Sequence, residues 1–405
     1  MLTLVFESYR LTQADVAKLL EPDSDDGRIY QQVRTLENEG QAELEHVAAV
    51  TTRSGNRTKI ESIHELIYPT EFSPPAKASL PSFPTGFETR NLGETFEVES
   101  TILADGISCH LDAAPRFTTF QRWDEYGLNA AGPTTAQPLF LTRMLNSSRA
   151  IYLGKPALLG NFDAAAEAPA ADPQQNTHPA TPRSRSLLFV TLHIPKIISA
   201  QKPASAASTN NIALSYSFHS IRRDQARDLL TSNPGDLSET VRNLNASGEI
   251  ALEAVKTMHS RSGQRVRMDA FEEVIYPVNF EPSASEGNPP GAHSPTAFDT
   301  RNKGWSIEFE PTASADLSFC DMSFSLEYTT LFDSIGAGKG PGVVSSLPYR
   351  PIFQSQKINA SVTVGLGQTL FLGTMSPPRD TGLPGAKDEG RVWLAFARYD
   401  APVTQ

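Results

Sequence analysis

The first forty residues combine a short apolar strand, Leu2 to Ser8, with apolar side chains at helical spacing. The apolar positions of the two helical stretches are Val16, Leu19, Leu20, Ile29, Val33 and Leu36. Thr12, with Asp15 three residues later, predicts the cap of the first helix, and Gly40 predicts the end of the second. The chain is therefore expected to open with one strand and two short helices.

Beyond Gly40 the apolar period changes from 3.6 to two, which indicates strands with one buried face. In residues 96–113 the apolar positions are Phe96, Val98, Ile102, Ile107, Cys109, Leu111 and Ala113. Polar residues such as Glu97 and Asp112 alternate with them, and residues 104–106 supply a turn ending in Gly106. This segment is predicted to form a β-hairpin with one polar face.

The chain repeats itself along most of its length. "TTRSGNRTKIESIHELIYP" (51–69) returns 208 positions later as "HSRSGQRVRMDAFEEVIYP" (259–277), and "FETRNLGETFEVEST" (87–101) returns 211 positions later as "FDTRNKGWSIEFEPT" (298–312). Residues 137–143 and 153–160 return 213 positions later. The second helix returns too, with Asp236 as its predicted cap and Gly248 at its end. Collinear copies of this length indicate one unit written twice.

These patterns predict a β-rich α+β fold of two homologous units, each a strand plus two short helices followed by antiparallel β-hairpins. The first unit is expected to span residues 1–198, a linker 199–211, and the second unit 212–405. The run 163–186, rich in Ala and Pro, is predicted to be a mobile surface loop or disordered.

Composition and charge narrow the possible partners. Hydrophobic residues make up 39% of the 405, and 30 Pro and 26 Gly suit a chain of strands and turns. A net charge of −11 offers no basic field, so no nucleic-acid partner is expected. The start lacks a signal-peptide pattern, and no stretch approaches 18 apolar residues, so no helix is expected to cross a bilayer. Membrane insertion through strands stays open.

Candidate chemistry is sparse. The eight histidines form no H-x-x-x-H pair, no C-x-x-C or G-x-S-x-G motif occurs, and "GAGKGPG" (336–342) lacks the Ser or Thr of a phosphate loop. Cys109 and Cys320 occupy matching positions, which favours one apolar core position used twice over a disulfide. No catalytic residue, metal site or cofactor is predicted, and the chain is not expected to be an enzyme.

Two features of the 51–69 repeat carry specific expectations. Gly55 and Gly263 are predicted to supply a tight turn at positive φ between the strands of a first hairpin. Pro69 and Pro277, which lack an amide hydrogen, are predicted to end that ladder or to place it at a sheet edge.

The doubled "TRN" also carries an expectation. Arg90-Asn91 and Arg301-Asn302 are interpreted as turns in which Asn adopts turn geometry and Arg pairs with a neighbouring carboxylate. A contact with a partner protein is the alternative interpretation.

Taken in order, these blocks resemble the C-terminal homology domain of secretins, the multimeric outer-membrane rings of type II and type III secretion and of type IV pili. The resemblance covers most of residues 45–198 and 253–402. Its signature residues are Arg53, Gly55, Tyr68, Pro69, Arg90, Asn91 and Gly93 in the first copy and Arg261, Gly263, Tyr276, Pro277, Arg301, Asn302 and Gly304 in the second. The family implies a β-rich protomer that contributes hairpins to a shared double-walled barrel, with no chemistry.

The chain departs from that family in three ways. Where a gate hairpin should follow the last glycine of the "LGG"-like block, the copies read "NFDAAAEAPAADPQQ" and "TMSPPRDTGLPGAKDEG". Neither ring-stacking amino-terminal domains nor a signal peptide is expected from the sequence, and two homology domains are expected in one chain instead of one.

Two hypotheses for function follow. The first is a non-enzymatic structural or assembly protein of a bacterial envelope secretion or pilus-type system, built from two secretin-like units without the gate. The second is a soluble adaptor or binding module that kept the secretin fold without forming a pore. Either would use protein partners or self-association through sheet edges. The periplasm or outer membrane is the expected location, and a cytoplasmic one stays open because no signal peptide is visible.

Overall fold

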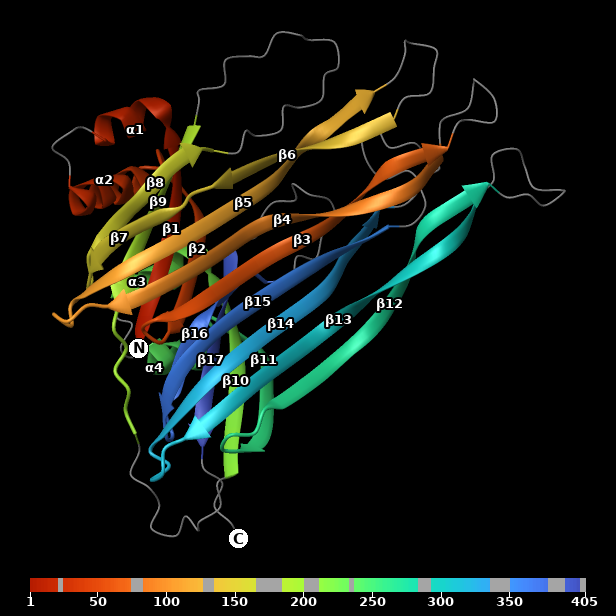
Figure 1. The fold of residues 1–405 in the computed structure, drawn as a ribbon. Helices are drawn as coiled ribbons and strands as arrows, with labels where there is room; N and C mark the ends of the chain where they lie inside the picture. Colours follow the sequence, from red (N-terminus) through yellow and green to blue (C-terminus); the bar gives the residue numbers. More distant parts are fainter. Residues whose placement is uncertain are drawn as a thin grey trace.

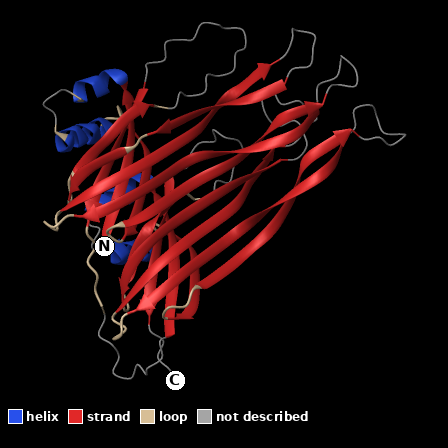
Figure 2. Cartoon of the chain, viewed as in Figure 1, coloured by secondary structure: helices blue, strands red, loops and turns tan. Residues whose placement is uncertain are grey.

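The computed structural model describes residues 1–20, 25–73, 83–126, 135–164, 184–199, 211–232, 237–282, 293–335, 350–377 and 390–400. Within these ranges the chain forms 17 strands and four helices, which confirms a β-rich α+β fold (Figure 2). None of these helices has the length and apolar character needed to cross a bilayer. Most of the expected linker, most of the run 163–186 and the glycine-rich run 336–342 lie outside the described residues.

Each half begins with a strand and two short helices, as the sequence predicts. The first half contains β1 (Leu2–Thr12), α1 (Gln13–Leu19), α2 (Asp26–Asn38), β2 (Glu43–Thr52), β3 (Asn56–Ser73), β4 (Phe83–Ile102), β5 (Ser108–Tyr126), β6 (Thr135–Met144), β7 (Ser147–Tyr152), β8 (Pro156–Asp163) and β9 (Ser184–His193). The second half contains β10 (Asn211–Arg222), α3 (Arg223–Ser232), α4 (Leu237–Ser247), β11 (Ala251–Arg261), β12 (Val266–Pro282), β13 (His293–Ala313), β14 (Phe319–Ile335), β15 (Arg350–Gly365), β16 (Thr369–Met375) and β17 (Arg391–Asp400).

Local sequence signals explain the helices. The backbone N–H of Asp15 donates to the Thr12 hydroxyl at 3.2 Å, so Thr12 caps α1 as predicted. α2 ends two residues before Gly40, whose φ is +73°, and buries Ile29 and Val33 against the sheet. The cap predicted at Asp236 lies outside the described residues.

The strands form two sheets, and both halves contribute to each (Figure 1). An eight-stranded sheet has the order β11-β10-β17-β16-β2-β1-β9-β8; all four helices pack against its strands, and we call it the helix-backed sheet. A nine-stranded sheet has the order β12-β13-β14-β15-β3-β4-β5-β6, with β7 also paired to β5, and we call it the long-strand sheet. In both, the strands of the second half precede those of the first in the same relative order. The halves are therefore arranged head to tail.

Strand registers in the two halves match at the offsets of the sequence repeat. Ile60 lies opposite Phe96, as Met268 lies opposite Ile307. In the same way β5 pairs with β7 at Cys109, and β14 pairs with β15 at Cys320. β15 is a single strand at the positions where the first half has β6 and β7.

The main core lies between the two sheets and spans both halves. It includes Phe6 and Phe96 from the first half and Tyr216 and Phe309 from the second. Both cysteines are fully buried in it and are free thiols, which confirms their prediction as apolar core positions. The predicted hairpin of residues 96–113 is confirmed as the β4–β5 pair.

Candidate functional site: the junction between the halves

The two halves meet along one strand pair in each sheet. In the long-strand sheet β15 pairs with β3 over seven residue pairs, from Phe353 opposite Glu65 to Asn359 opposite Lys59. In the helix-backed sheet β16 pairs with β2 next to Gly373. The edge strands β15 and β16 of the second half thus pair with the edge strands β3 and β2 of the first half.

The contact between β16 and β2 depends on the small size of Gly373. A Cβ atom at this position would lie 2.8 Å from the Ala49 carbonyl oxygen, closer than such atoms approach. Beside it, the Ala49 backbone N–H donates to the Thr374 hydroxyl at 2.8 Å. A side-chain hydrogen bond thereby satisfies a backbone donor at the edge where the halves join.

An arginine–glutamate pair crosses the long-strand sheet between the halves. Two guanidinium N–H groups of Arg301 on β13 donate to the two carboxylate oxygens of Glu65 on β3, at 2.6 and 3.2 Å. The side chains are 31% and 18% exposed, so the pair is partly shielded from water. Bidentate arginine–carboxylate pairs specify geometry as well as adding energy, so this pair helps to set the register of the halves.

Apolar side chains surround the Arg301–Glu65 pair. Ile67 of β3 packs with Tyr276 of β12 and Phe353 of β15, whose rings lie 5.9 Å apart. Phe87 and Phe280 are in ring contact at 6.2 Å, again from opposite halves. The junction therefore has an apolar core beside an ion pair, as in a stable protein interface.

The helices add a second layer of inter-half contacts, which we call the helix clamp. The Arg227 guanidinium on α3 donates to the Glu37 carboxylate on α2. Arg34 of α2 reaches Asp228 of α3 at 3.1 Å. Arg227 and Glu37 are only 5% and 16% exposed, so theirs is a buried ion pair.

A buried carboxylate lies beneath the helix clamp. Glu7 of β1 is fully buried and accepts hydrogen bonds from the hydroxyls of Tyr9, at 2.6 Å, and Tyr30, at 2.9 Å. Burial raises the pKa of Glu7, while these hydroxyls and the nearby Arg227 and Arg34 guanidiniums act against that rise. These hydrogen bonds connect α2 to β1 of the helix-backed sheet, and α3 packs against the same strand.

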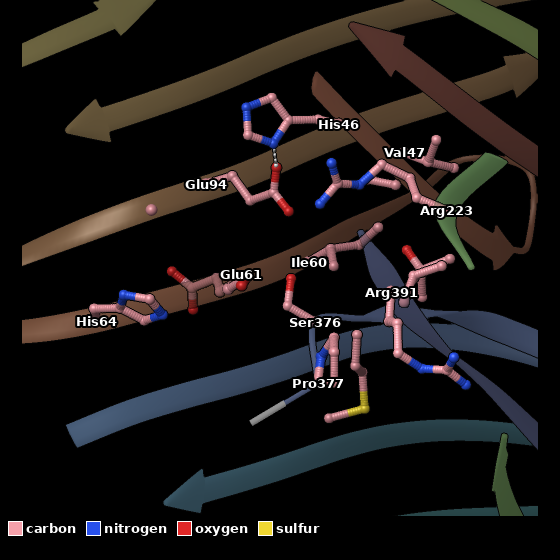
Figure 3. A pocket seen from close by; sticks show the side chains of 16 residues that line it. His46, Val47, Ile60, Glu61, His64, Glu94, Arg223, Ser376, Pro377 and Arg391 are labelled. Carbon is pink, nitrogen blue, oxygen red and sulfur yellow. Dashed lines mark ion pairs between the residues drawn. The ribbon is translucent and has the colours of Figure 1, made fainter. Parts of the chain in front are cut away.

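One small cavity, of about 90 Å³, opens at the junction (Figure 3). It lies between β2, β3, β4, β16 and the start of α3, and His46 Nδ1 lies 2.8 Å from a Glu94 carboxylate oxygen on its wall. Arg391 on the same wall donates to the Ser220 hydroxyl and carbonyl, so it serves the fold. Ligand sites usually measure roughly 300–1,000 Å³, and this space is large enough for a few water molecules only.

The turn prediction is right in geometry and wrong in topology. Gly55 and Gly263 have φ of +79° and +77°, as expected. However, β2 belongs to the helix-backed sheet and β3 to the long-strand sheet, so the turn after Arg53 links two sheets and is not the turn of a hairpin. The same holds for Arg261 between β11 and β12. Alternating patterns cannot distinguish these cases, because both need a sharp reversal between two one-faced strands.

The prolines do not end their strands. β3 continues past Pro69 to Ser73 with a register shift directly after the proline, and β12 shows the same shift after Pro277. The edge alternative holds for Pro277, since β12 is an edge strand of the long-strand sheet. Tyr68 and Tyr276 donate to carboxylates on the neighbouring strands β4 and β13, at 3.2 and 3.5 Å.

The "TRN" motifs lie inside strands, so their prediction as turns is wrong. Arg90-Asn91 are within β4 and Arg301-Asn302 within β13. The turn-like conformation belongs instead to the glycine two residues later: Gly93 and Gly304 have φ of +113° and +140°. The expected carboxylate partner exists for Arg301, whereas Arg90 donates to the Thr142 hydroxyl at 3.2 Å.

Sequence reasoning missed the residues that join the halves. Glu65 stands inside the quoted repeat but has no distinguishing pattern, and Arg227 and Glu37 are 190 positions apart. The close approach at Gly93 and Gly304 could have been found, because both glycines recur at matching positions inside predicted strands.

Comparisons with known proteins found similar solved structures but no matching family model or curated protein. Similar solved structures include the type IV competence pilus secretin PilQ of V. cholerae, with 13% identity, a TM-score of 0.26 and coverage of 54% of this chain and 68% of that one. The InvG secretin domain of the Salmonella SPI-1 injectisome has 13% identity and a TM-score of 0.26, with coverage of 72% of this chain and 89% of that one.

These structures belong to the family that the sequence motifs resemble. A TM-score of 0.26 is too low to carry a functional argument.

Proposed function

We propose that this protein is a non-enzymatic structural subunit of a bacterial envelope secretion or pilus-type system, and that it works by lateral self-association. The proposal includes its origin as a tandem duplication of a secretin-like unit, with residues 1–198 and 212–405 as the two copies. Matching registers in the two halves support the duplication. The secretin resemblance supports an envelope location, in the periplasm or outer membrane.

The observation that carries the proposal is the head-to-tail order of both sheets. Inside the chain β16 joins β2 and β15 joins β3. At one end the chain leaves β8 and β6 at the sheet edges, the counterparts of β16 and β15, and at the other end it leaves β11 and β12, the counterparts of β2 and β3 (Figure 1). Unpaired edges of long strands are templates for another chain, and a heterologous contact of this kind repeats from copy to copy.

Mass measurement tests this proposal. Purified full-length protein, examined by light scattering and negative-stain imaging over a concentration series with and without detergent, is expected to form particles of several copies. A strictly monomeric particle under every condition would overturn the proposal.

Two further measurements distinguish the channel-like assembly from the adaptor alternative. Liposome flotation and conductance recording are both expected to be negative for a soluble adaptor. Fractionation of the native host would test the envelope location, since a purely cytoplasmic protein contradicts it.

A further inference from the structure

We call the contact of β15 with β3 and of β16 with β2 the inner junction. Apolar side chains at the β11–β12 end are exposed, whereas their counterparts at the inner junction are buried. Ile67 of β3 is 6% exposed, whereas Ile275, 208 positions later on β12, is 64% exposed. Val47 of β2 is 6% exposed, whereas Val255 on β11 is 55% exposed. The second half covers Ile67 and Val47, and no described residue of the chain covers Ile275 and Val255 to the same degree. The β11–β12 end therefore exposes the surface that the second half covers at the inner junction.

Apolar side chains are also more exposed at the opposite end, formed by β6 and β8, than at the inner junction. Ile352 of β15 is 1% exposed, and its counterpart Leu139 of β6, 213 positions earlier, is 38% exposed. Leu366, which follows β15, is 6% exposed, and its counterpart Leu153 is 41% exposed. Exposed apolar side chains at both free ends mark surfaces for association.

The charged pair of the inner junction also has counterparts at the two ends. Arg301 corresponds to Arg90 at an offset of 211, and Glu65 corresponds to Glu273 at an offset of 208. Arg90 already lies over β6, donating to Thr142 and sitting 5.8 Å from the Phe140 ring centre. Glu273 is exposed, and within the described part of the chain no ion pair involves its carboxylate.

We propose that a second copy of this chain docks its β12 edge on the β6 edge of the first, in the register of the inner junction. Phe353 minus 213 is Phe140, and Glu65 plus 208 is Glu273, so Phe140 would lie opposite the partner's Glu273. Arg90 would then pair with that Glu273 as Arg301 pairs with Glu65. This inference rests on the proposed function and specifies the interface that the proposed function needs.

The charges of the two edges differ. β6 and β7 carry no acidic residue; Arg143 is buried and Arg149 pairs with Asp26, so the exposed Arg90 of the neighbouring β4 supplies the positive charge at this edge. The acidic residues of β12 outnumber its one arginine, Arg267, and are Asp269, Glu272, Glu273 and Glu281. Opposite charges on the two ends favour head-to-tail contact and disfavour contact between like ends.

The contact between two copies, which we call the outer junction, lacks the helix clamp. Matching bulges in β1 and β10 give an offset of 210 for α1 and α3, so the counterpart of Arg227 is Ala17. At the offset of 208 that applies to α2 and α4, the counterpart of Glu37 is Asn245. Copies would thus be joined by strand pairing, the exposed apolar side chains of the two ends and the Arg90–Glu273 pair, without an ion pair between helices. The outer junction is expected to open on dilution or in salt while each chain stays folded.

Charge exchange between two variants tests the interface. Glu273→Arg and Arg90→Glu each place like charges at the outer junction, so each variant alone is expected to need at least tenfold more protein than wild type to assemble. An equimolar mixture restores opposite charges at every contact and is expected to assemble at wild-type concentrations, with the two variants in equal numbers. The double variant Arg90→Glu/Glu273→Arg is expected to assemble by itself.

Matched controls separate this result from misfolding and from general charge effects. Glu272→Arg makes the same charge change at the neighbouring position, on the other face of β12 by strand alternation, and is expected to assemble like wild type. Unchanged thermal unfolding would show that the variants fold. The proposed interface is wrong, while self-association stands, if wild type assembles and neither single variant weakens assembly, or if the mixture of variants fails to restore it. A strictly monomeric wild type overturns both the interface and the proposed function.

Discussion

The Arg227 guanidinium of α3 donates to the Glu37 carboxylate of α2, and this buried pair joins two helices from opposite halves of the chain. Arg227→Met would leave Glu37 shielded from water with Arg34, at 3.1 Å, as its one remaining ion-pair partner among the described residues. Breaking a buried ion pair costs about 3–5 kcal/mol, and we expect the lower end, about 3 kcal/mol, in denaturant unfolding. Arg227→Met/Glu37→Met should recover most of that loss, and a double variant as unstable as the single one would contradict this account.

Gly93 is expected to be indispensable to the β3–β4 ladder. Its φ is +113°, and a Cβ atom there would lie 2.1 Å from the Ser62 carbonyl oxygen. Gly93→Ala should therefore prevent folding or cost several kcal/mol, beyond the roughly 1–2 kcal/mol of a left-handed residue. Gly106→Ala is the matched control, since Gly106 has φ of +68° with nothing within 4 Å of the added carbon. Equal unfolding midpoints for the two variants would contradict the steric explanation.

Both cysteines should be unreactive in the folded protein. Burial raises the pKa of the Cys109 thiol to about 11 and that of Cys320 to about 12, so little thiolate exists at neutral pH. Titration with a thiol reagent at pH 8 should detect no fast-reacting thiol in the native protein and two in denaturant. A fast-reacting thiol in the native protein would contradict the core assignment.

His193 should make the protein less stable in mild acid. Burial lowers its pKa to about 4 from an ordinary value of 6.5, and the side chain is 6% exposed. The folded state therefore favours the neutral ring, so its contribution is complete above pH 6.5 and is lost as the pH falls towards 4. At about 1.4 kcal/mol per unit the loss is up to roughly 3 kcal/mol.

Unfolding midpoints measured between pH 7 and 4 test this contribution. His193→Gln should flatten the dependence, whereas His259→Gln, at an exposed site on β11, should leave it unchanged. An equally steep pH dependence in His193→Gln would contradict the assignment.

The repeating patterns of the sequence were sufficient for the local structure. Period-two alternation predicted the β4–β5 hairpin, Thr12 predicted its helix cap, and the matching positions of Cys109 and Cys320 predicted two buried thiols. Each of these signals depends on residues close together in the chain or on the pattern of one face. Such signals are set by backbone geometry and burial, which a sequence records directly.

The placement of strands into sheets was decided by tertiary structure. Gly55 has the predicted positive φ, yet the turn that it makes joins two sheets, because β2 pairs with β1 and β16 whereas β3 pairs with β4 and β15. The Arg301–Glu65 and Arg227–Glu37 pairs join residues 236 and 190 positions apart. Contacts at such separations depend on the packing of whole sheets, and no local pattern records them.

The sequence by itself determined that its motifs recur 208 to 213 positions apart and which faces of its strands are apolar. It could not determine whether β3 or its counterpart β12 pairs with β15, because equivalent residues such as Ile67 and Ile275 are the same amino acid in the same register. Only the folded chain distinguishes them, as one lies at 6% exposure under the other half and the other at 64% exposure on a free edge. The physical reason is that a head-to-tail pair of like units buries one junction and leaves the matching surfaces open at its two ends.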